Sequence, residues 1–198
     1  MMLAGAALAA PVARAADGSA LYARCVACHG AHGEGVASTG GPAIAGMEPW
    51  YVERQLRNFA SGLRGSRAGD TRGQSMRAAS ATLVSDAERQ AVAAHVAALP
   101  RPRMPAVGAP TASGRNYFNA ICSACHGSNG LGNEKLGAPR IAGRAPEFLA
   151  GELAAFRSGR RGAQDGDRYG AQMRAILAML PDAATERDVV GYAAGLGR

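Results

Sequence analysis

Aromatic side chains are scarce in this chain: they make up 5% of its 198 residues, and charged side chains make up 19%. With so few large rings, the residues alone do not supply a big aromatic core, and we expect something else to fill its centre. Alanine and the 27 glycines carry much of the composition. The length suits two domains of about 100 residues each better than one small domain.

Long hydrophobic runs are also missing, so no segment reaches the roughly 20 residues that span a bilayer. The N-terminal apolar run is short and is followed by Ala13-Arg14-Ala15, a small-x-small cleavage signature. We interpret residues 1–15 as a secretory signal peptide. The basic start typical of such leaders is missing, which indicates a recorded start that is either truncated or misplaced. The alternative is an Ala-rich N-terminal tail. A signal peptide predicts export, and hence a periplasmic protein.

A basic tail is absent as well, although the net charge is +7. Arginine supplies 21 of the 22 basic residues and is spread along the chain rather than gathered in runs. This distribution favours docking on an acidic protein partner at least as well as binding to nucleic acid.

The sequence contains an internal repeat. Cys25-Val26-Ala27-Cys28-His29-Gly30 recurs 97 positions later as Cys122-Ser123-Ala124-Cys125-His126-Gly127. The same offset relates Pro42, Leu56, Phe59, Gly62, Arg64, Met76 and Leu99 to Pro139, Leu153, Phe156, Gly159, Arg161, Met173 and Leu196. No insertion or deletion is needed in this set, so we infer a duplicated domain. We place the first domain at 16–99 and the second at 112–198, joined by a Pro-rich, semi-rigid linker at 100–111.

The periodicity within each copy is helical. Pro49 opens a segment with apolar residues three and four positions apart, and Ser85 with Glu88 forms a capping box ahead of another. Asp17 or Ser19 is the expected cap of the first helix, and Ser113 the expected cap of its counterpart. No run alternates β-branched and polar residues, so the sequence predicts an all-α fold with Gly-rich loops.

The two Cys-x-x-Cys-His units have the spacing of c-type haem attachment sites. Thiols three residues apart lie on nearly one helix face and can reach both vinyl groups of a haem, while the following His places its imidazole under the iron. A thioredoxin-like dithiol needs a βαβ context that is absent here, and a structural zinc site needs its two Cys pairs closer in sequence. Two disulfides are disfavoured because each unit is complete within its own repeat. The sequence predicts two covalent haem c groups, attached at Cys25 and Cys28 and at Cys122 and Cys125, with His29 and His126 as iron ligands.

Methionine is the usual second ligand opposite His in such a haem, where it raises the reduction potential. Met76 and Met173 are equivalent by the offset of 97, and each lies 47 residues after its His. We therefore predict Met76 and Met173 as the axial ligands. Core packing, the ordinary role of a methionine, suits Met47 and Met179.

Four further residues are candidates for supporting the haem. A carbonyl beside Pro42 and Pro139 would accept the His Nδ1 proton, although these prolines would equally serve to stiffen a turn. Arg64 and Arg161 are candidate partners of haem propionates, with solvated arginines as the alternative.

The whole set resembles the cytochrome c4 family, the dihaem class I c-type cytochromes of bacterial periplasms. The resemblance rests on both Cys-x-x-Cys-His-Gly units, Gly-Pro-x-Ile-Ala-Gly from Gly41, the Leu-x-x-Phe-x-x-Gly-x-Arg helix end, and the Met ahead of the last helix. It implies two cytochrome c (class I) domains facing each other, each wrapped around one haem ligated by His29 and Met76 or by His126 and Met173. It departs from the pattern where Ala138 replaces the Gly before Pro139.

These features predict a periplasmic one-electron carrier that is not an enzyme. It would shuttle electrons from a quinol-oxidising complex or dehydrogenase to a terminal oxidase or reductase, because two saturated irons leave no open position for a substrate. The alternatives are a cytochrome subunit of a larger oxidoreductase complex and a dihaem redox enzyme such as a peroxidase. The expected partners are redox proteins with acidic docking surfaces, with no nucleic acid, and with membrane contact only through a membrane complex.

Overall fold

The computed structural model describes residues 16–104 and 108–197. The proposed signal peptide at 1–15 lies outside the described residues, as does part of the proposed linker. The described residues are mostly helical, with two isolated β-bridges and no strand. The described residues form two all-helical halves, as the sequence predicts.

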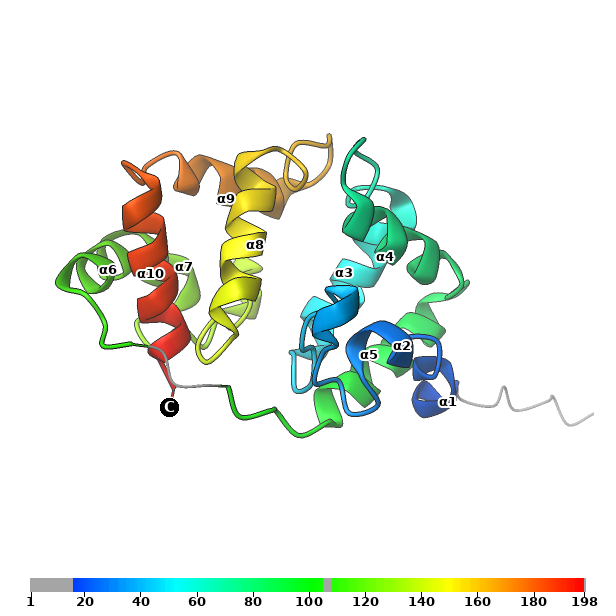
Figure 1. Cartoon of the computed structure of the whole chain (residues 1–198). Coiled ribbons are helices and arrows are strands. Elements are labelled where there is room, and N and C mark those ends of the chain that lie inside the picture. Colours follow the sequence, from blue (N-terminus) through cyan, green and yellow to red (C-terminus); the bar gives the residue numbers. More distant parts are fainter. Residues whose placement is uncertain (1–15, 105–107, 198) are drawn as a thin grey trace, which may run out of the picture.

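The two halves contain corresponding helices in the same order, and the second half has one additional π-helix (Figure 1). Those of the first half are α1 (Gly18–Tyr22), α2 (Val26–His29), the 3₁₀ turn η1 (Ala37–Thr39), α3 (Pro49–Ser61), α4 (Thr71–Ala81) and α5 (Asp86–Ala98). Those of the second half are α6 (Ala112–Tyr117), the π-helix η2 (Phe118–Cys122), α7 (Ser123–His126), η3 (Glu134–Leu136), α8 (Pro146–Arg157), α9 (Arg168–Leu177) and α10 (Ala183–Gly195).

The first helix of each half crosses the last helix at a glycine. A Cβ on Gly18 would lie 2.1 Å from the Ala91 carbonyl oxygen, and one on Gly114 would lie 2.2 Å from the Asp188 carbonyl oxygen. Only glycine allows backbones to approach this closely. The first helix therefore packs on α5 in one half and on α10 in the other.

The caps confirm one sequence expectation and correct another. Asp17 caps α1 by accepting bonds from the amides of Ser19 and Ala20, and Ser85 with Glu88 forms the expected capping box of α5. The cap of α6 is Thr111, whose hydroxyl accepts from the Gly114 amide, and not Ser113. Ser113 lies at the position equivalent to Asp17, but α6 begins two residues earlier, because the Thr111 hydroxyl is available to the Gly114 amide and places Ser113 inside the first turn.

Each half has its own hydrophobic core. The first is built from residues of α1, α3 and α5, including Tyr22, Leu56 and Val96, and the second includes Phe118, Phe156 and Val189. Phe148 packs against both cores. Met47 is buried as expected, but Met179 is 61% exposed, so its assignment to the core was wrong.

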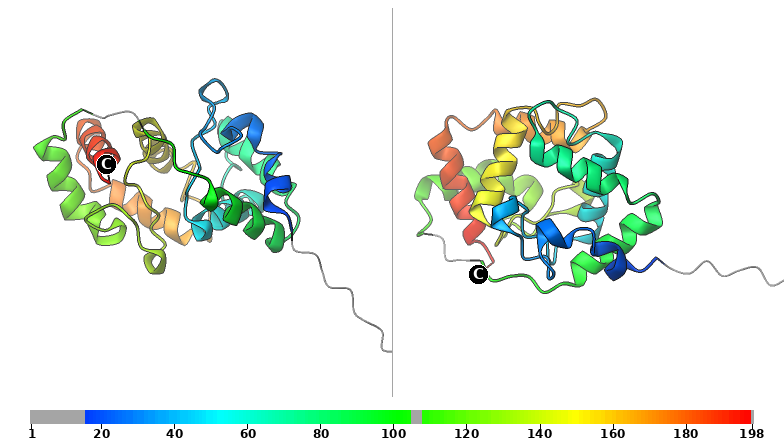
Figure 2. Two further views of the ribbon diagram at one scale, coloured as in Figure 1. Left: turned by 90° about the horizontal axis from the view of Figure 1, so that it is seen from below. Right: turned by 45° about the vertical axis from the view of Figure 1, so that its right-hand side comes forward.

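The two halves meet along α3 and α8, which face each other across the middle of the molecule (Figure 1). Seen from below, the helices of the two halves again lie on opposite sides of the molecule (Figure 2). Side chains of α3 and α8, together with the segments that precede α4 and α9, form the seam between the halves: Arg64 donates to Glu152, Arg161 to Gln55, and Gln164 to Ser66.

Candidate functional site

The histidine of each Cys-x-x-Cys-His unit is buried at the C-terminal end of a short helix, where it is 6% exposed. His29 Nδ1 lies 2.9 Å from the Pro42 carbonyl oxygen, and His126 Nδ1 lies 2.8 Å from the Pro139 carbonyl oxygen. Each Nδ1–H therefore donates to a carbonyl, which fixes the ring and leaves the Nε2 lone pair free to bind a metal.

Burial keeps both imidazoles uncharged. It lowers the pKa of His29 and of His126 from the usual value, and the hydrogen bond to the proline carbonyl offsets only part of that effect. A neutral imidazole is the form that ligates iron, so no proton needs to leave for the metal to bind at neutral pH.

A methionine sulfur faces the first histidine. Met76 Sδ on α4 lies 3.4 Å from His29 Nε2, although 47 residues separate the two in sequence. The equivalent Met173 on α9 lines a cavity together with His126, Cys122 and Cys125. A thioether and a neutral imidazole form the donor pair of a Met/His haem iron, so these residues fit that group.

The four cysteines are free, and Cys28 and Cys125 are exposed. Burial raises the pKa of Cys25, and burial together with Cys125 raises the pKa of Cys122 to about 11. These thiols are therefore protonated at neutral pH in the protein without a bound group. Within the described ranges no three His, Cys, Asp or Glu side chains are grouped to hold a metal ion.

The cavity beside His126 is lined mostly by apolar residues of the second half and is closed by side chains of the first. The first half contributes Met47, Tyr51, Arg54, Gln55 and Asn58. An apolar cavity between a histidine and a methionine is the shape that a flat porphyrin requires. Its location at the seam means that the first half helps to enclose what the second half binds.

Arg64 and Arg161 lie together in this seam. Arg64 donates to Gln55 Oε1 at 2.8 Å and to Glu152 at 3.3 Å, and Arg161 pairs with the same Glu152. Burial, followed by the charge of Arg64, lowers the pKa of Arg161 to about 10. The Nε atoms of both arginines are buried without a hydrogen-bond partner. Two buried guanidiniums with unused donors fit an anion such as a haem propionate.

Sequence reasoning missed the other members of this network. Gln55 and Glu152 are equivalent by the offset of 97 and hold the two arginines from α3 and α8. The sequence does contain a signal for these two residues. Each copy has a polar residue directly before the repeated leucine, Leu56 or Leu153, on a helix whose other face is apolar. Arg54 was also missed, because its counterpart in the second copy is Gly151, so the repeat does not mark this position.

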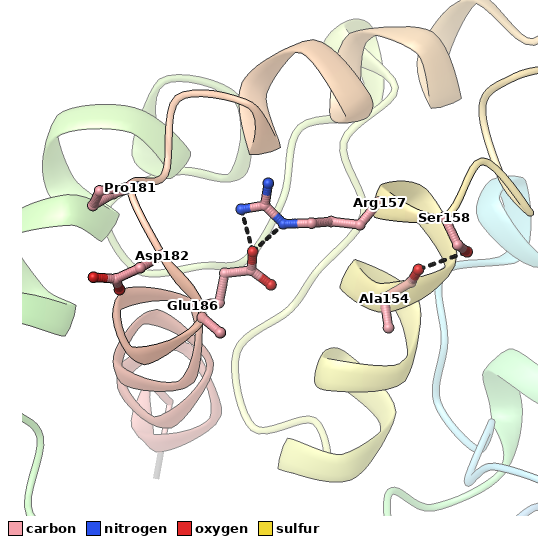
Figure 3. A pocket seen from close by; sticks show the side chains of 7 residues that line it. Ala154, Arg157, Ser158, Pro181, Asp182 and Glu186 are labelled. Carbon is pink, nitrogen blue, oxygen red and sulfur yellow. Dashed lines mark hydrogen bonds and ion pairs between the residues drawn. The ribbon is translucent and has the colours of Figure 1, made fainter.

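A second hollow lies on the outer face of the second half, between the end of α8 and the start of α10 (Figure 3). Its volume is about 620 Å³, and an ion pair between Arg157 and Glu186 crosses it. None of the predicted site residues lines it, so it is not the candidate site.

The comparisons with known proteins agree with this geometry. The chain matches the cytochrome c family model over residues 15–100 and 111–192. It is 35% identical over 186 residues to the thiosulfate dehydrogenase electron acceptor of Stutzerimonas stutzeri (strain A1501), covering 83% of this chain and 81% of that protein. It is 30% identical over 178 residues to cytochrome c4 of Azotobacter vinelandii, covering 84% of this chain and 81% of that protein.

Solved structures give the same relatives. Cytochrome c4 of Pseudomonas stutzeri aligns with a TM-score of 0.69 at 27% identity, over 90% of this chain and 96% of that one. The thiosulfate dehydrogenase of Marichromatium purpuratum aligns with a TM-score of 0.65 at 27% identity, over 90% of this chain and 39% of that one.

Proposed function

Because the chain belongs to the cytochrome c family and is a two-domain, cytochrome c4-like electron carrier, we propose that it binds two covalent haem c groups and passes single electrons between periplasmic redox proteins. The proposed thioether bonds form at Cys25 and Cys28 and at Cys122 and Cys125. The proposed axial ligands are His29 with Met76 and His126 with Met173. When bound, the haem iron supplies reversible one-electron chemistry.

The residues of the chain contribute orientation, exclusion of water and charge. Pro42 and Pro139 hold the two histidines through their carbonyls, at 2.9 and 2.8 Å. Arg64 and Arg161 place positive charge at the seam, where each would bind a propionate and disfavour an additional positive charge on the iron. The single observation that carries the proposal is the His29–Met76 pairing, because it brings an imidazole and a thioether together across 47 residues.

We further propose that a thiosulfate dehydrogenase is one electron donor. This rests on the 35% identity to an electron acceptor of that enzyme. The chain would act as the acceptor rather than the oxidising enzyme, because all four of its cysteines are assigned to haem attachment. A place as a subunit of a larger complex is the second candidate, since the related Marichromatium purpuratum chain is much longer than this one.

Absorption spectroscopy of the purified holoprotein tests the assignment. We expect two haems per chain, low-spin spectra in both redox states, a near-infrared methionine–iron band, and no rapid binding of carbon monoxide to the reduced protein. A high-spin haem, or rapid carbon monoxide binding at either site, would favour an enzyme instead. Thiosulfate with a purified thiosulfate dehydrogenase is expected to reduce the holoprotein, whereas thiosulfate alone leaves it oxidised.

A further inference from the structure

The side chain of Arg54, on α3 of the first half, contacts residues of the second half. Its Nη2 donates to the Gly137 carbonyl at 2.7 Å, and its guanidinium carbon lies 4.5 Å from the centre of the Tyr169 ring. The rings of Trp50 and Tyr51, from its own helix, lie 5.0 and 5.4 Å away. A cation surrounded by aromatic faces and half-buried in this way is held firmly.

Both contacts in the second half fall on segments that carry the proposed haem ligands. Gly137 comes two residues before Pro139, whose carbonyl accepts from His126 Nδ1. Tyr169 comes four residues before Met173, about one turn earlier on α9. The two segments also touch each other, because a Cβ on Gly137 would lie 2.3 Å from Tyr169 Cε1. Arg54 therefore connects the loop that holds His126 with the helix that carries Met173.

The carboxylate of Asp167 strengthens this arrangement. Asp167 caps α9 by accepting from the Gly170 amide at 3.0 Å, and it also accepts from the Gly162 amide at 3.1 Å. Its charge acts on Arg54 and opposes the burial that lowers the pKa of that guanidinium. The start of the methionine-bearing helix thus contacts Arg54 through the Tyr169 ring, and the charge of its capping carboxylate favours the charged guanidinium.

Among the described residues, the second half has no arginine at the position equivalent to Arg54. The position equivalent to Arg54 is Gly151, and a Cβ there would meet nothing within 4 Å. The position equivalent to Tyr169 is Arg72, which lies against Gly40, the counterpart of Gly137. The two copies, though built alike, therefore differ at this contact.

We propose that Arg54 is a positioning residue for the second haem site, acting across the seam. It holds the 137–139 loop and the start of α9 in one arrangement, and so sets His126 and Met173 relative to each other. Its positive charge also favours the reduced form of the second haem. The proposal deepens the proposed function and rests on it, because it requires a haem ligated by His126 and Met173.

Redox titration of the holoprotein tests the role of Arg54. In Arg54→Gln we expect the reduction step of the second haem to move to lower potential while the other step stays in place. The second-haem step is identified as the one that Met173→Ala displaces. Arg54→Lys should recover only part of the shift, because an ammonium keeps the charge but lacks the planar fork that binds Gly137 and stacks on Tyr169. The control is Arg57→Gln, three residues further along α3 at an exposed side chain, which should leave both steps unchanged.

A double-mutant cycle with Tyr169→Leu separates positioning from charge. If Arg54 acts through Tyr169, the shifts of the two single variants should add to more than the shift of the double variant. Three results would overturn the proposal while two Met-ligated haems remain. The first is that Arg54→Gln leaves both reduction potentials unchanged, and the second is that it shifts both equally. The third is that Arg54→Lys has the reduction potentials of the wild type. A wild-type holoprotein without two such haems would overturn the proposed function itself.

Discussion

Tyr22 and Phe118 take the same place against the last helix of their halves, although they are 96 positions apart and not 97. The Tyr22 ring lies 5.0 Å from that of His95, and the Phe118 ring lies 5.2 Å from that of Tyr192. His95 and Tyr192 keep the offset of 97. The extra residue before Cys122 is absorbed by the π-helix, so the aromatic contact is preserved in both halves.

The crossing glycines are expected to limit stability. Gly18→Ala and Gly114→Ala should each lower the free energy of unfolding by about 1–3 kcal/mol, because the new methyl group meets a backbone carbonyl that cannot move away. Denaturant unfolding of the holoproteins measures the loss. Gly151→Ala is the control: its methyl group meets nothing within 4 Å, and it should stabilise α8 by about 0.5–1 kcal/mol. Wild-type stability of Gly18→Ala would contradict the close crossing.

Removal of one proposed axial sulfur should affect one haem only. In Met76→Ala and in Met173→Ala we expect the near-infrared methionine–iron absorbance to fall by about half, with a lower potential for the altered haem. Carbon monoxide should then bind to that haem in the reduced protein. Met179→Ala, at a side chain that is 61% exposed, should leave the spectrum unchanged. A full-strength band in Met76→Ala would remove Met76 from the ligand set.

The cap of α10 should weaken in acid. Hydrogen bonds from Thr185 lower the pKa of the Asp182 carboxyl, with the Thr185 amide 2.8 Å from Asp182 Oδ1. The folded-state pKa lies below the unfolded value of about 3.9. The stabilisation is therefore complete above about pH 4 and is lost as the pH falls through the lowered folded pKa. Asp182→Ser, which copies Ser85 of the first half, should keep the cap and lose this part of the pH dependence of unfolding. An unaltered acid profile would show that Asp182 does not titrate with folding.

The Glu152 carboxylate should stabilise the folded protein at the seam between the halves. It is the carboxylate that both Arg64 and Arg161 contact, so Glu152→Gln leaves two buried guanidiniums facing each other and should cost about 3 kcal/mol. The charge-swapped variant with Gln55→Glu and Glu152→Gln should regain much of the stability, because Gln55 already contacts both arginines. Glu147→Gln, at an exposed residue of the same helix, is the matched control. Thermal unfolding decides between these outcomes, and equal stabilities of Glu152→Gln and wild type would contradict the network.

Electron transfer to an acidic partner should slow as salt rises. The net charge of +7 favours encounter with a negative surface, and ions screen that attraction beyond about 10 Å at 0.1 M salt. Stopped-flow mixing at several ionic strengths measures the effect. A rate that does not change with salt would exclude electrostatic steering.

The repeat made much of the fold predictable from sequence. Helix starts such as Pro49 and the Ser85 cap are local signals, and the structure places both as expected. The Thr111 cap was missed because Thr111 and Ser113 are both good capping residues, and the sequence pattern does not show which of them starts the helix. The exposure of Met179 and the grouping of Arg64, Gln55 and Glu152 depend on what packs against a helix, which periodicity does not record.

Phe148 packs against both cores, and its counterpart in the first half is the buried Tyr51. If the two halves were separated, each would carry one of these rings on a face that is now covered, and that face would favour self-association. A separated half is therefore expected to be less soluble than the whole chain.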